Sequence, residues 1–310
     1  DCAEKGVNSV HFFTAGFSES GRADRLKLEQ SMLAIAESAG FRIIGPNCVG
    51  LHVPKSRQAT MFGVSHEPGN IAFISQSGGH AQNMVKYGDS RGLRFSKVVS
   101  YGNGLDINEI ELLDYFATDP ETDFIAIYIE GTRNGEAFRN ALLNASVRKP
   151  LVIYKGGQSE AGKRATFGHT ASMTSSVNVF RAVCRQANAV QTDSLEEMID
   201  LLTVLYFVKT PPVGKGVVLV GGGGGPSVYA GDVMEKEGLF LPTPTGRQRE
   251  ALQEVLPLDG SIFANPLDAS NLGSPEAVQQ TLTIMGDNPE VHMLVYHMGF
   301  HPITQWGLGR

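Results

Sequence analysis

The chain has 310 residues, 36 of them glycine, and its 26 basic and 32 acidic residues give a formal net charge of -6. Its 42% hydrophobic content excludes a disordered chain, and no apolar run reaches the ~18–20 residues of a membrane span. Without a Lys/Arg cluster, neither nucleic acid nor a membrane surface is expected as a partner. Three cysteines without metal spacing, and a start that lacks a signal peptide, predict a cytoplasmic protein with no metal site of its own.

The predicted strands are short apolar runs, each followed by glycine or a small polar residue and then by helical periodicity. In chain order they are Val10–Thr14, Ile71–Ser75, Lys97–Tyr101, Phe124–Ile129, Leu151–Lys155, Val217–Val220 and Val291–His297. This alternation is typical of βα units on a parallel sheet, and continuous apolar strands indicate a sheet covered by helices on both faces. We therefore predict α/β domains.

Three helix starts carry capping signals. Ser194 and Glu197 have capping-box spacing, and Ser274-Pro275 places proline at a first helical position. Asp106 is predicted to cap the helix that follows it.

Two stretches of turn-forming residues predict the domain boundaries. Gly45-Pro46-Asn47 closes the first βα unit, and residues 209–216 (KTPPVGKG) form the clearest linker. Residues 46–209 are thus predicted as one whole domain. We expect 1–45, which are too short to fold alone, to be the end of a preceding domain, and 210–310 to be the start of a following one.

A serine- and glycine-rich turn follows the second predicted strand. A helix that starts there has its free N–H groups and positive dipole end at the carboxyl edge of the sheet, pointing outward. Such a helix start is an anion site. The candidate phosphate-binding residues are Ser75, Gln76, Ser77, Gly78 and Gly79. A tight βα turn that simply favours serine and glycine explains the same residues.

The run Gly221–Gly225 forms a second such turn. Neither turn has the lysine and Ser/Thr of a P-loop, or a complete G-x-G-x-x-G with a suitably placed acidic residue, which disfavours a dinucleotide enzyme. Close packing of the backbone against a neighbouring loop is the simpler explanation of this glycine run.

His169 differs from the other histidines because it lies in a long polar loop. Residues 155–172 (KGGQSEAGKRATFGHTAS) are too rich in glycine to form a regular element. An imidazole on such a loop can move, and it is a competent nucleophile near neutral pH. His80, inside the serine-glycine turn, is expected to be structural.

Glu130 ends a predicted strand, so its carboxylate is expected at the carboxyl edge of the sheet, where open α/β folds bind ligands. There it can accept a hydrogen bond from one imidazole nitrogen and so fix the tautomer in which the other attacks. Helix capping is the competing role.

Five short motifs occur in order along the chain: Gly45–Gly50 (GPNCVG), Ser75–Gly78 (SQSG), Ser100–Asn103 (SYGN), Glu130-Gly131 and Ser159–Ser172. Together they resemble the nucleoside-diphosphate-forming acyl-CoA synthetases, the superfamily of succinyl-CoA synthetase and ADP-forming acetyl-CoA synthetase. The resemblance implies that 1–45 end a CoA-binding Rossmann-like domain. It makes 46–209 a parallel-sheet, three-layer, flavodoxin-like phosphohistidine domain, and 210–310 the start of a second flavodoxin-like domain.

The resemblance also implies a chemistry. In the family, acyl-CoA and phosphate give an acyl phosphate, whose phosphoryl group moves to a loop histidine and then to a nucleotide. His169 matches the phosphorylated histidine and Glu130 the carboxylate that orients it. The turn at 75–79 matches the helix N-terminus that binds the phosphate of phosphohistidine.

Ligands and partners follow from the same resemblance. Thr14 and Gly16 match the turn near the CoA arm, and Asn47 and Cys48 are expected near the CoA thiol. Coenzyme A is a substrate, together with phosphate and a carboxylic acid or its acyl-CoA. ATP or ADP with Mg²⁺ is expected through an ATP-grasp domain or β-type subunit that this sequence lacks, and we expect an oligomer.

Two other functions stay open. Related chains are CoA-binding regulatory regions fused to lysine acetyltransferases, without nucleotide-forming activity, and a non-catalytic interaction protein would keep the same scaffold. The presence of His169 and Glu130 favours the ligase.

Overall fold

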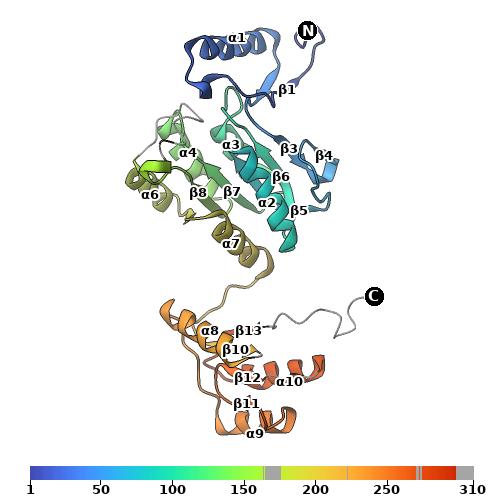
Figure 1. Ribbon diagram of the computed structural model, residues 1–310, viewed down its shortest axis with the longest axis vertical. Coiled ribbons are helices and arrows are strands. Elements are labelled where there is room, and N and C mark those ends of the chain that lie inside the picture. The colour runs from blue at the N-terminus through green and yellow to red at the C-terminus, as the bar shows by residue number, and fades with distance from the viewer. Residues whose placement is uncertain (163, 165–175, 222, 270–271, 273, 298–310) are drawn as a thin grey trace. The chain divides into compact units, whose positions relative to one another are not determined.

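Figure 1 shows the computed structural model of the chain, which describes residues 1–162, 164, 176–221, 223–269, 272 and 274–297. His169 lies outside these residues. Contacts divide the chain into two compact units, Asp1–Lys209 and Thr210–Arg310. The finer division at residue 45 stays a prediction. None of the helices in the described ranges is long and apolar enough to cross a membrane.

A seven-stranded sheet of order β4-β3-β6-β5-β7-β8-β9 forms the centre of the first unit. The five strands from β6 to β9 in this order are parallel, whereas β3 and β4 join one edge in antiparallel pairings. The strands are β3 (Gly50–Val53), β4 (Gln58–Ala59), β5 (Pro68–Ser75), β6 (Phe95–Ser100), β7 (Phe124–Ile129), β8 (Leu151–Lys155) and β9 (Val190–Thr192).

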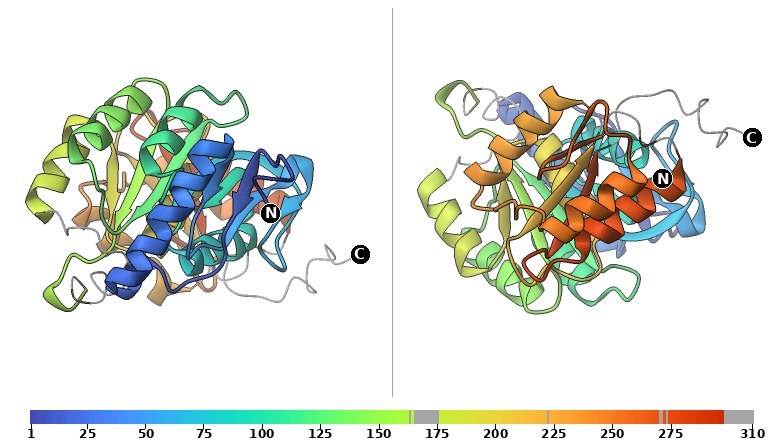
Figure 2. Two further views of the ribbon diagram at one scale, coloured as in Figure 1. Left: turned by 90° about the horizontal axis from the view of Figure 1, so that it is seen from above. Right: turned by 90° about the horizontal axis from the view of Figure 1, so that it is seen from below.

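Helices cover both faces of this sheet, which gives three layers (Figures 1 and 2). The helices are α2 (Gly78–Ser90), α3 (Glu109–Thr118), α4 (Gly135–Ser146), α6 (Val177–Gln186) and α7 (Leu195–Phe207). Leu113, Phe138 and Phe180 bring α3, α4 and α6 onto one face. Met84 and Met198 bring α2 and α7 onto the other. The predicted α/β fold is confirmed.

The first 45 residues form a small layer of their own. Strands β1 (Ser9–His11) and β2 (Arg42–Ile44) pair in parallel, and α1 (Ala23–Ala39) connects them. Their core residues Ala36, Phe41 and Ile43 pack against Leu105, which follows β6. This contact joins the segment to the main sheet.

The capping role predicted for Asp106 is wrong. Its carboxylate accepts hydrogen bonds from the backbone N–H of Ile43 at 2.7 Å and from the Arg42 guanidinium at 2.9 Å. Helix α3 begins at Glu109, and the side chain of Asn108 accepts from the N–H of Ile110 at 3.0 Å. Asp106 instead connects β2 to the turn after β6.

The two other predicted helix starts are present. Ser194 accepts a hydrogen bond from the N–H of Glu197, whose carboxylate reaches back to the N–H of Asp193. Ser274 caps α10 with Pro275 in its first turn.

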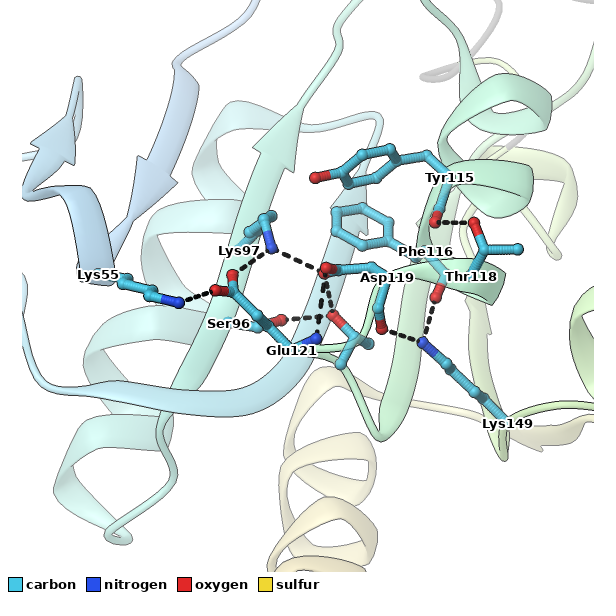
Figure 3. A network of polar contacts seen from close by, with 10 residues as sticks. Lys55, Ser96, Lys97, Tyr115, Phe116, Thr118, Asp119, Glu121 and Lys149 are labelled. Carbon is cyan, nitrogen blue, oxygen red and sulfur yellow. Dashed lines mark hydrogen bonds and ion pairs between the residues drawn. The ribbon is translucent and has the colours of Figure 1, made fainter.

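A polar network closes the amino edge of the main sheet (Figure 3). The Lys97 ammonium on β6 donates to Asp119 and to Glu121, each at 2.7 Å, and Lys55 pairs with Glu121 from the side of the solvent. The Lys149 ammonium donates to the carbonyl of Phe116 at 2.6 Å. These bonds connect the end of α3 and the segment after it to β6 and to the residues before β8.

The second unit contains a four-stranded sheet of order β11-β12-β10-β13. Its elements are β10 (Val217–Gly221), α8 (Gly224–Lys236), α9 (Gly246–Val255), β11 (Ser261–Ile262), β12 (Leu267–Ala269), α10 (Pro275–Gly286) and β13 (Met293–His297). Leu252 of α9 and Met285 of α10 share one core with β10 and β12. Strands β12 and β13 are parallel to β10.

The described part of the glycine run shows close backbone packing. The N–H of Gly223 donates to Asp268 at 2.9 Å, and a Cβ atom on Gly224 would lie 3.2 Å from the same carboxylate. A Cβ atom on Gly221 would lie 3.1 Å from His297. The approach of β12 and β13 to the turn explains these glycines, as the simpler interpretation expected.

Candidate active site

The carboxyl edge of the main sheet brings the turns after β5, β6, β7 and β8 together. Backbone bonds continue the ladder past the strand ends: Gln76 donates to Tyr128, Tyr101 donates to Ser75, and Gly156 donates to Ile129, at 2.9–3.0 Å. The predicted phosphate turn and Glu130 therefore belong to neighbouring strands.

Three neighbours hold Glu130. Its N–H donates to the side-chain oxygen of Gln76 at 2.7 Å, and that oxygen also accepts the N–H of Gly131 at 3.2 Å. The Tyr128 hydroxyl donates to Glu130 Oε1 at 3.1 Å. Lys155 Nζ donates to the Glu130 carbonyl at 2.5 Å. Contacts of its main chain and of its side chain thus fix Glu130 at the sheet edge.

Capping is not the role of Glu130. Helix α4 has Asn134 as its N-cap, and the Asn134 side chain accepts the N–H of Ala137 at 3.0 Å. Glu130 lies before this cap, in the turn that follows β7. The competing structural role from the sequence is therefore wrong.

Lys155 is a part of this edge that sequence reasoning missed. It is 2% exposed, and its ammonium also donates to the Gly156 carbonyl at 2.6 Å and lies 5.9 Å from the centre of the Phe180 ring. A lysine at the end of an apolar strand, directly before two glycines, is the signal that could have indicated it. Through its two carbonyl contacts, Lys155 joins the exit of β8 to the exit of β7.

The serines of the predicted phosphate turn shape the turn itself. Buried Ser75 donates from its hydroxyl to the Ser77 carbonyl at 2.6 Å and accepts the Ser77 N–H at 3.2 Å. Ser77 is the N-cap of α2, and its hydroxyl accepts the N–H of His80 at 3.3 Å. Gly78 and Gly79 occupy the first two helical positions, where an N–H has no partner within the helix.

The two glycines have different surroundings. A Cβ atom on Gly78 would lie 2.3 Å from Val49 Cγ2, so packing against the loop before β3 requires glycine there. Gly79 is exposed, and the nearest atom to a Cβ there would be 3.8 Å away. Of the two glycines, only Gly79 therefore has room for a side chain.

His80 packs against the ring of Tyr128. Its ring meets the Tyr128 ring edge-on, with 4.2 Å between centres and 77° between planes. Burial lowers the pKa of His80, although the charge of Glu196 acts in the opposite direction. The neutral imidazole supports the position of Tyr128.

The residues predicted near CoA also lie together. The N–H of Asn47 donates to the Thr14 carbonyl at 3.0 Å, and the Asn47 side chain donates to that of Asn103 at 3.3 Å. Asn47 has φ of 58°, a left-handed conformation that Asn tolerates better than most residues. The Thr14 turn, the Asn47 loop and the turn after β6 therefore form one neighbourhood.

Cys48 and Gly16 both have contacts within the protein. The Cys48 thiol is buried beside the Phe12 carbonyl, and burial raises its pKa to about 12. The N–H groups of Gly16 and Phe17 both donate to the Glu19 carboxylate. The Cys48 thiol is consequently buried and protonated near neutral pH.

The buried Glu29 connects this neighbourhood to the sheet edge. Glu29 is 1% exposed and accepts from the N–H of Ser18 at 2.8 Å and from the Asn103 side chain at 3.2 Å. Arg133, three residues after Glu130, lies 3.6 Å from Glu29 and donates to the Asn103 carbonyl at 3.1 Å. No motif pointed to Glu29 or Arg133.

A small cavity of about 70 Å³ opens between these groups. Its lining residues include Gln76, Tyr101, Asn103, Glu109 and Arg133. Burial raises the pKa of Glu109 despite hydrogen bonds that favour its ionised form. In the described ranges, no group of three or more His, Cys, Asp or Glu side chains could hold a metal ion.

Known proteins resemble the chain along nearly its whole length. Residues 68–205 match the succinyl-CoA ligase like flavodoxin domain. The chain is 34% identical over 95% of its length to ADP-forming acetate–CoA ligase I of Archaeoglobus fulgidus, of which it covers 42%. It is 33% identical over 95% of its length to the α subunit of ADP-forming acetate–CoA ligase II of Pyrococcus furiosus, of which it covers 64%. Residues 68–205 thus form a succinyl-CoA ligase like flavodoxin domain, in a chain that is similar along nearly its whole length to ADP-forming acetate–CoA ligases.

A solved acetyl-coenzyme A synthetase has the same fold. Acetyl-coenzyme A synthetase 1 of Ca. Korarchaeum cryptofilum, in complex with phosphate and ADP, superposes with a TM-score of 0.78 at 30% identity, covering 96% of this chain and 64% of that one. The present chain thus spans between about two fifths and two thirds of these relatives' lengths.

Proposed function

We propose that the chain is the α-type part of an ADP-forming acyl-CoA synthetase, an acid–thiol ligase. The observation that carries the proposal is the Glu130 carboxylate, held beside the exposed start of α2 by Gln76, Tyr128 and Lys155. Phosphoryl transfer through a phosphohistidine requires a carboxylate that orients the nucleophilic imidazole and a helix N-terminus that binds the phosphate. The named relatives support the assignment because they are ADP-forming ligases.

The proposed reaction has three transfers. A phosphate oxygen attacks the thioester carbonyl of acyl-CoA, the C–S bond breaks, and CoA leaves as its thiol. An imidazole nitrogen of His169 then attacks the phosphorus of the acyl phosphate, and the carboxylic acid leaves as the P–O bond breaks. Finally, an oxygen of the ADP β-phosphate attacks the phosphohistidine, and breakage of the P–N bond gives ATP and free histidine.

The chain's own residues position these steps. Glu130 accepts the N–H of one imidazole nitrogen and stabilises the positive charge that develops on the ring. The N–H groups of Gly78 and Gly79 bind the phosphoryl oxygens at the start of α2, where the helix dipole favours negative charge. Thr14, Gly16 and Asn47 line the path of CoA, with the Cys48 thiol as part of the wall.

The nucleotide and its Mg²⁺ belong to an ATP-grasp domain or β-type subunit in this proposal. Mg²⁺ would neutralise charge on the nucleotide phosphates. The cytoplasm fits the function, because CoA, phosphate and ADP are available there.

Radiolabelled phosphate tests the proposal. The full-length protein, together with its ATP-grasp chain where that is separate, is incubated with acetyl-CoA and labelled phosphate, and ADP is then added. We expect an acid-labile, base-stable label that ADP converts into labelled ATP. His169→Asn should abolish the label, whereas His66→Asn, at an exposed loop position, should retain it. An acid-stable label, or labelling of His169→Asn, would contradict the proposal.

A further inference from the structure

Tyr128 on β7 and Glu130, directly after the end of that strand, form a side-chain pair. Residues two apart in a strand project to the same face, and the Tyr128 hydroxyl lies 3.1 Å from Glu130 Oε1. Tyr128 is 6% exposed and is otherwise a core residue between α2 and α7. The Tyr128 hydroxyl therefore donates to the Glu130 carboxylate at the end of the core.

The Tyr128 hydroxyl is a permanent donor. Burial, and then the negative charge of Glu130, raise the pKa of Tyr128 far above its usual range. The phenol keeps its proton wherever the protein is folded. A hydrogen bond donated to a carboxylate favours the ionised form and fixes the direction of its oxygens.

The surroundings hold the tyrosine ring in one place. His80 meets it edge-on at 4.2 Å, and Tyr154 lies 5.2 Å from it between ring centres. On the side of β8, a Cβ atom at Gly156 would lie 2.5 Å from the Tyr128 hydroxyl and 3.3 Å from Glu130 Cγ. Glycine at position 156 leaves the space in which the pair forms.

We propose that Tyr128 is a positioning residue for the phosphohistidine chemistry: its hydroxyl sets the orientation and ionisation of Glu130, in the space that Gly156 leaves. This inference rests on the proposed function, since the carboxylate matters through the imidazole that it orients. In this proposal Tyr128 and Gly156 do not bind substrate, and both act through Glu130.

Tyr128→Phe isolates the hydroxyl because it keeps the ring and its contact with His80. Loss of a hydrogen bond to a charged group should slow His169 phosphorylation about 10- to 100-fold. The KM values for phosphate and acyl-CoA should stay unchanged. The acid limb of the rate profile should move to higher pH, because a carboxylate without its donor holds a proton more tightly.

Two further variants separate positioning from packing. Tyr154→Phe is the matched control, since it removes a hydroxyl from the neighbouring ring, and its rate should stay within twofold of wild type. Gly156→Ala should slow phosphorylation as Tyr128→Phe does, because the methyl group displaces the hydroxyl. The double variant should then lose little more than either single one, since the atom nearest the methyl group is gone.

A direct titration keeps this inference distinguishable from the proposed function. The Glu130 carboxyl is followed by ¹³C NMR in full-length wild type and in Tyr128→Phe, with Glu130→Gln for assignment. We expect the Glu130 pKa to rise in Tyr128→Phe and to stay unchanged in Tyr154→Phe. Wild type that takes no label contradicts the proposed function. An identical Glu130 titration in wild type and Tyr128→Phe, or a Tyr128→Phe rate within twofold of wild type in protein that labels, overturns the positioning role.

Discussion

The side-chain oxygen of Gln76 accepts the N–H of Glu130 at 2.7 Å and joins the turn after β5 to the turn after β7. It accepts the buried N–H of Gly131 as well, at 3.2 Å. Gln76 was predicted to bind phosphate. In the structure, its side-chain oxygen holds the main chain of the turn after β7. The amide is therefore a link between the predicted phosphate turn and the predicted orienting carboxylate.

Variants of Gln76 can separate this link from phosphate binding. Gln76→Met removes the acceptor of the part-buried Glu130 N–H and the buried Gly131 N–H, so the unfolding free energy should fall by about 1–3 kcal/mol. Gln76→Glu keeps an acceptor and should retain most of the stability. Its negative charge at the start of α2 should raise the KM for phosphate. Urea unfolding and initial rates measure the two effects, and a Gln76→Glu variant with wild-type KM would exclude Gln76 from the phosphate site.

Sequence patterns predicted the strands that are long and apolar. Strands β7 and β8 have the predicted bounds, because helices cover both of their faces and every position is constrained. Strands β4 and β9 have two and three residues and include glutamine, so no periodicity marks them. Tertiary pairing alone defines such short strands.

The candidate site was predictable where it follows from strand ends. Glu130 and the start of α2 lie at the carboxyl edge because parallel strands end there together. Tyr128 and Lys155 were missed, since a tyrosine in an apolar run indicates core and a terminal lysine usually indicates solvent. Asp106 was misassigned because its partner Arg42 is 64 residues away, a relationship that local spacing does not contain.

The Cys48 thiol should be chemically inert. Its pKa of about 12 leaves almost no thiolate at pH 8, and the sulfur is buried, so iodoacetamide should label Cys2, which is exposed, and spare Cys48. Cys48→Ala should keep kcat within a few-fold of wild type. Mass spectrometry of the folded protein measures the labelling. Rapid alkylation of Cys48 would show that the loop opens or that the thiol is activated.

Glu109 should destabilise the folded protein at neutral pH. Its pKa is raised above 4.5, chiefly by burial, so the folded state binds a proton more tightly than the unfolded state. The contribution of protonated Glu109 to stability is therefore fully present below pH 4.5, and it is lost as pH rises through the pKa of the folded state. Glu109→Gln should raise the unfolding free energy at pH 7 by on the order of 1 kcal/mol, and the gain should vanish near pH 4.

Glu136 provides the matched control for that measurement. Both glutamates lie in the first turn of a helix, but Glu136 is exposed. Glu136→Gln loses only a favourable helix-dipole interaction, so it should lower the stability at pH 7 by about 0.3–1 kcal/mol. A Glu109→Gln protein that is less stable than wild type at pH 7 would mean that hydrogen bonds to the ionised carboxylate outweigh its burial.

The Lys97–Asp119 pair should have the opposite pH dependence. Burial alone would raise the pKa of Asp119, but hydrogen bonds from Lys97 and Thr122 outweigh it, and the pKa lies below 3.8. Its contribution to stability is then complete above 3.8 and is lost as pH falls through the folded pKa. The difference in unfolding free energy between wild type and Asp119→Asn should accordingly be largest near neutral pH and shrink in acid.

Removal of one partner from this network distinguishes buried from exposed ion pairs (Figure 3). Lys97 and Asp119 expose only 14% and 5% of their side chains, so Lys97→Met leaves a buried carboxylate without its cation and should cost about 3 kcal/mol. Lys55 also pairs with Glu121 but is 69% exposed, and Lys55→Met should cost at most about 0.5 kcal/mol. Urea unfolding of the two variants side by side measures both effects. Equal losses would show that desolvation of Asp119 does not control the stability of this edge.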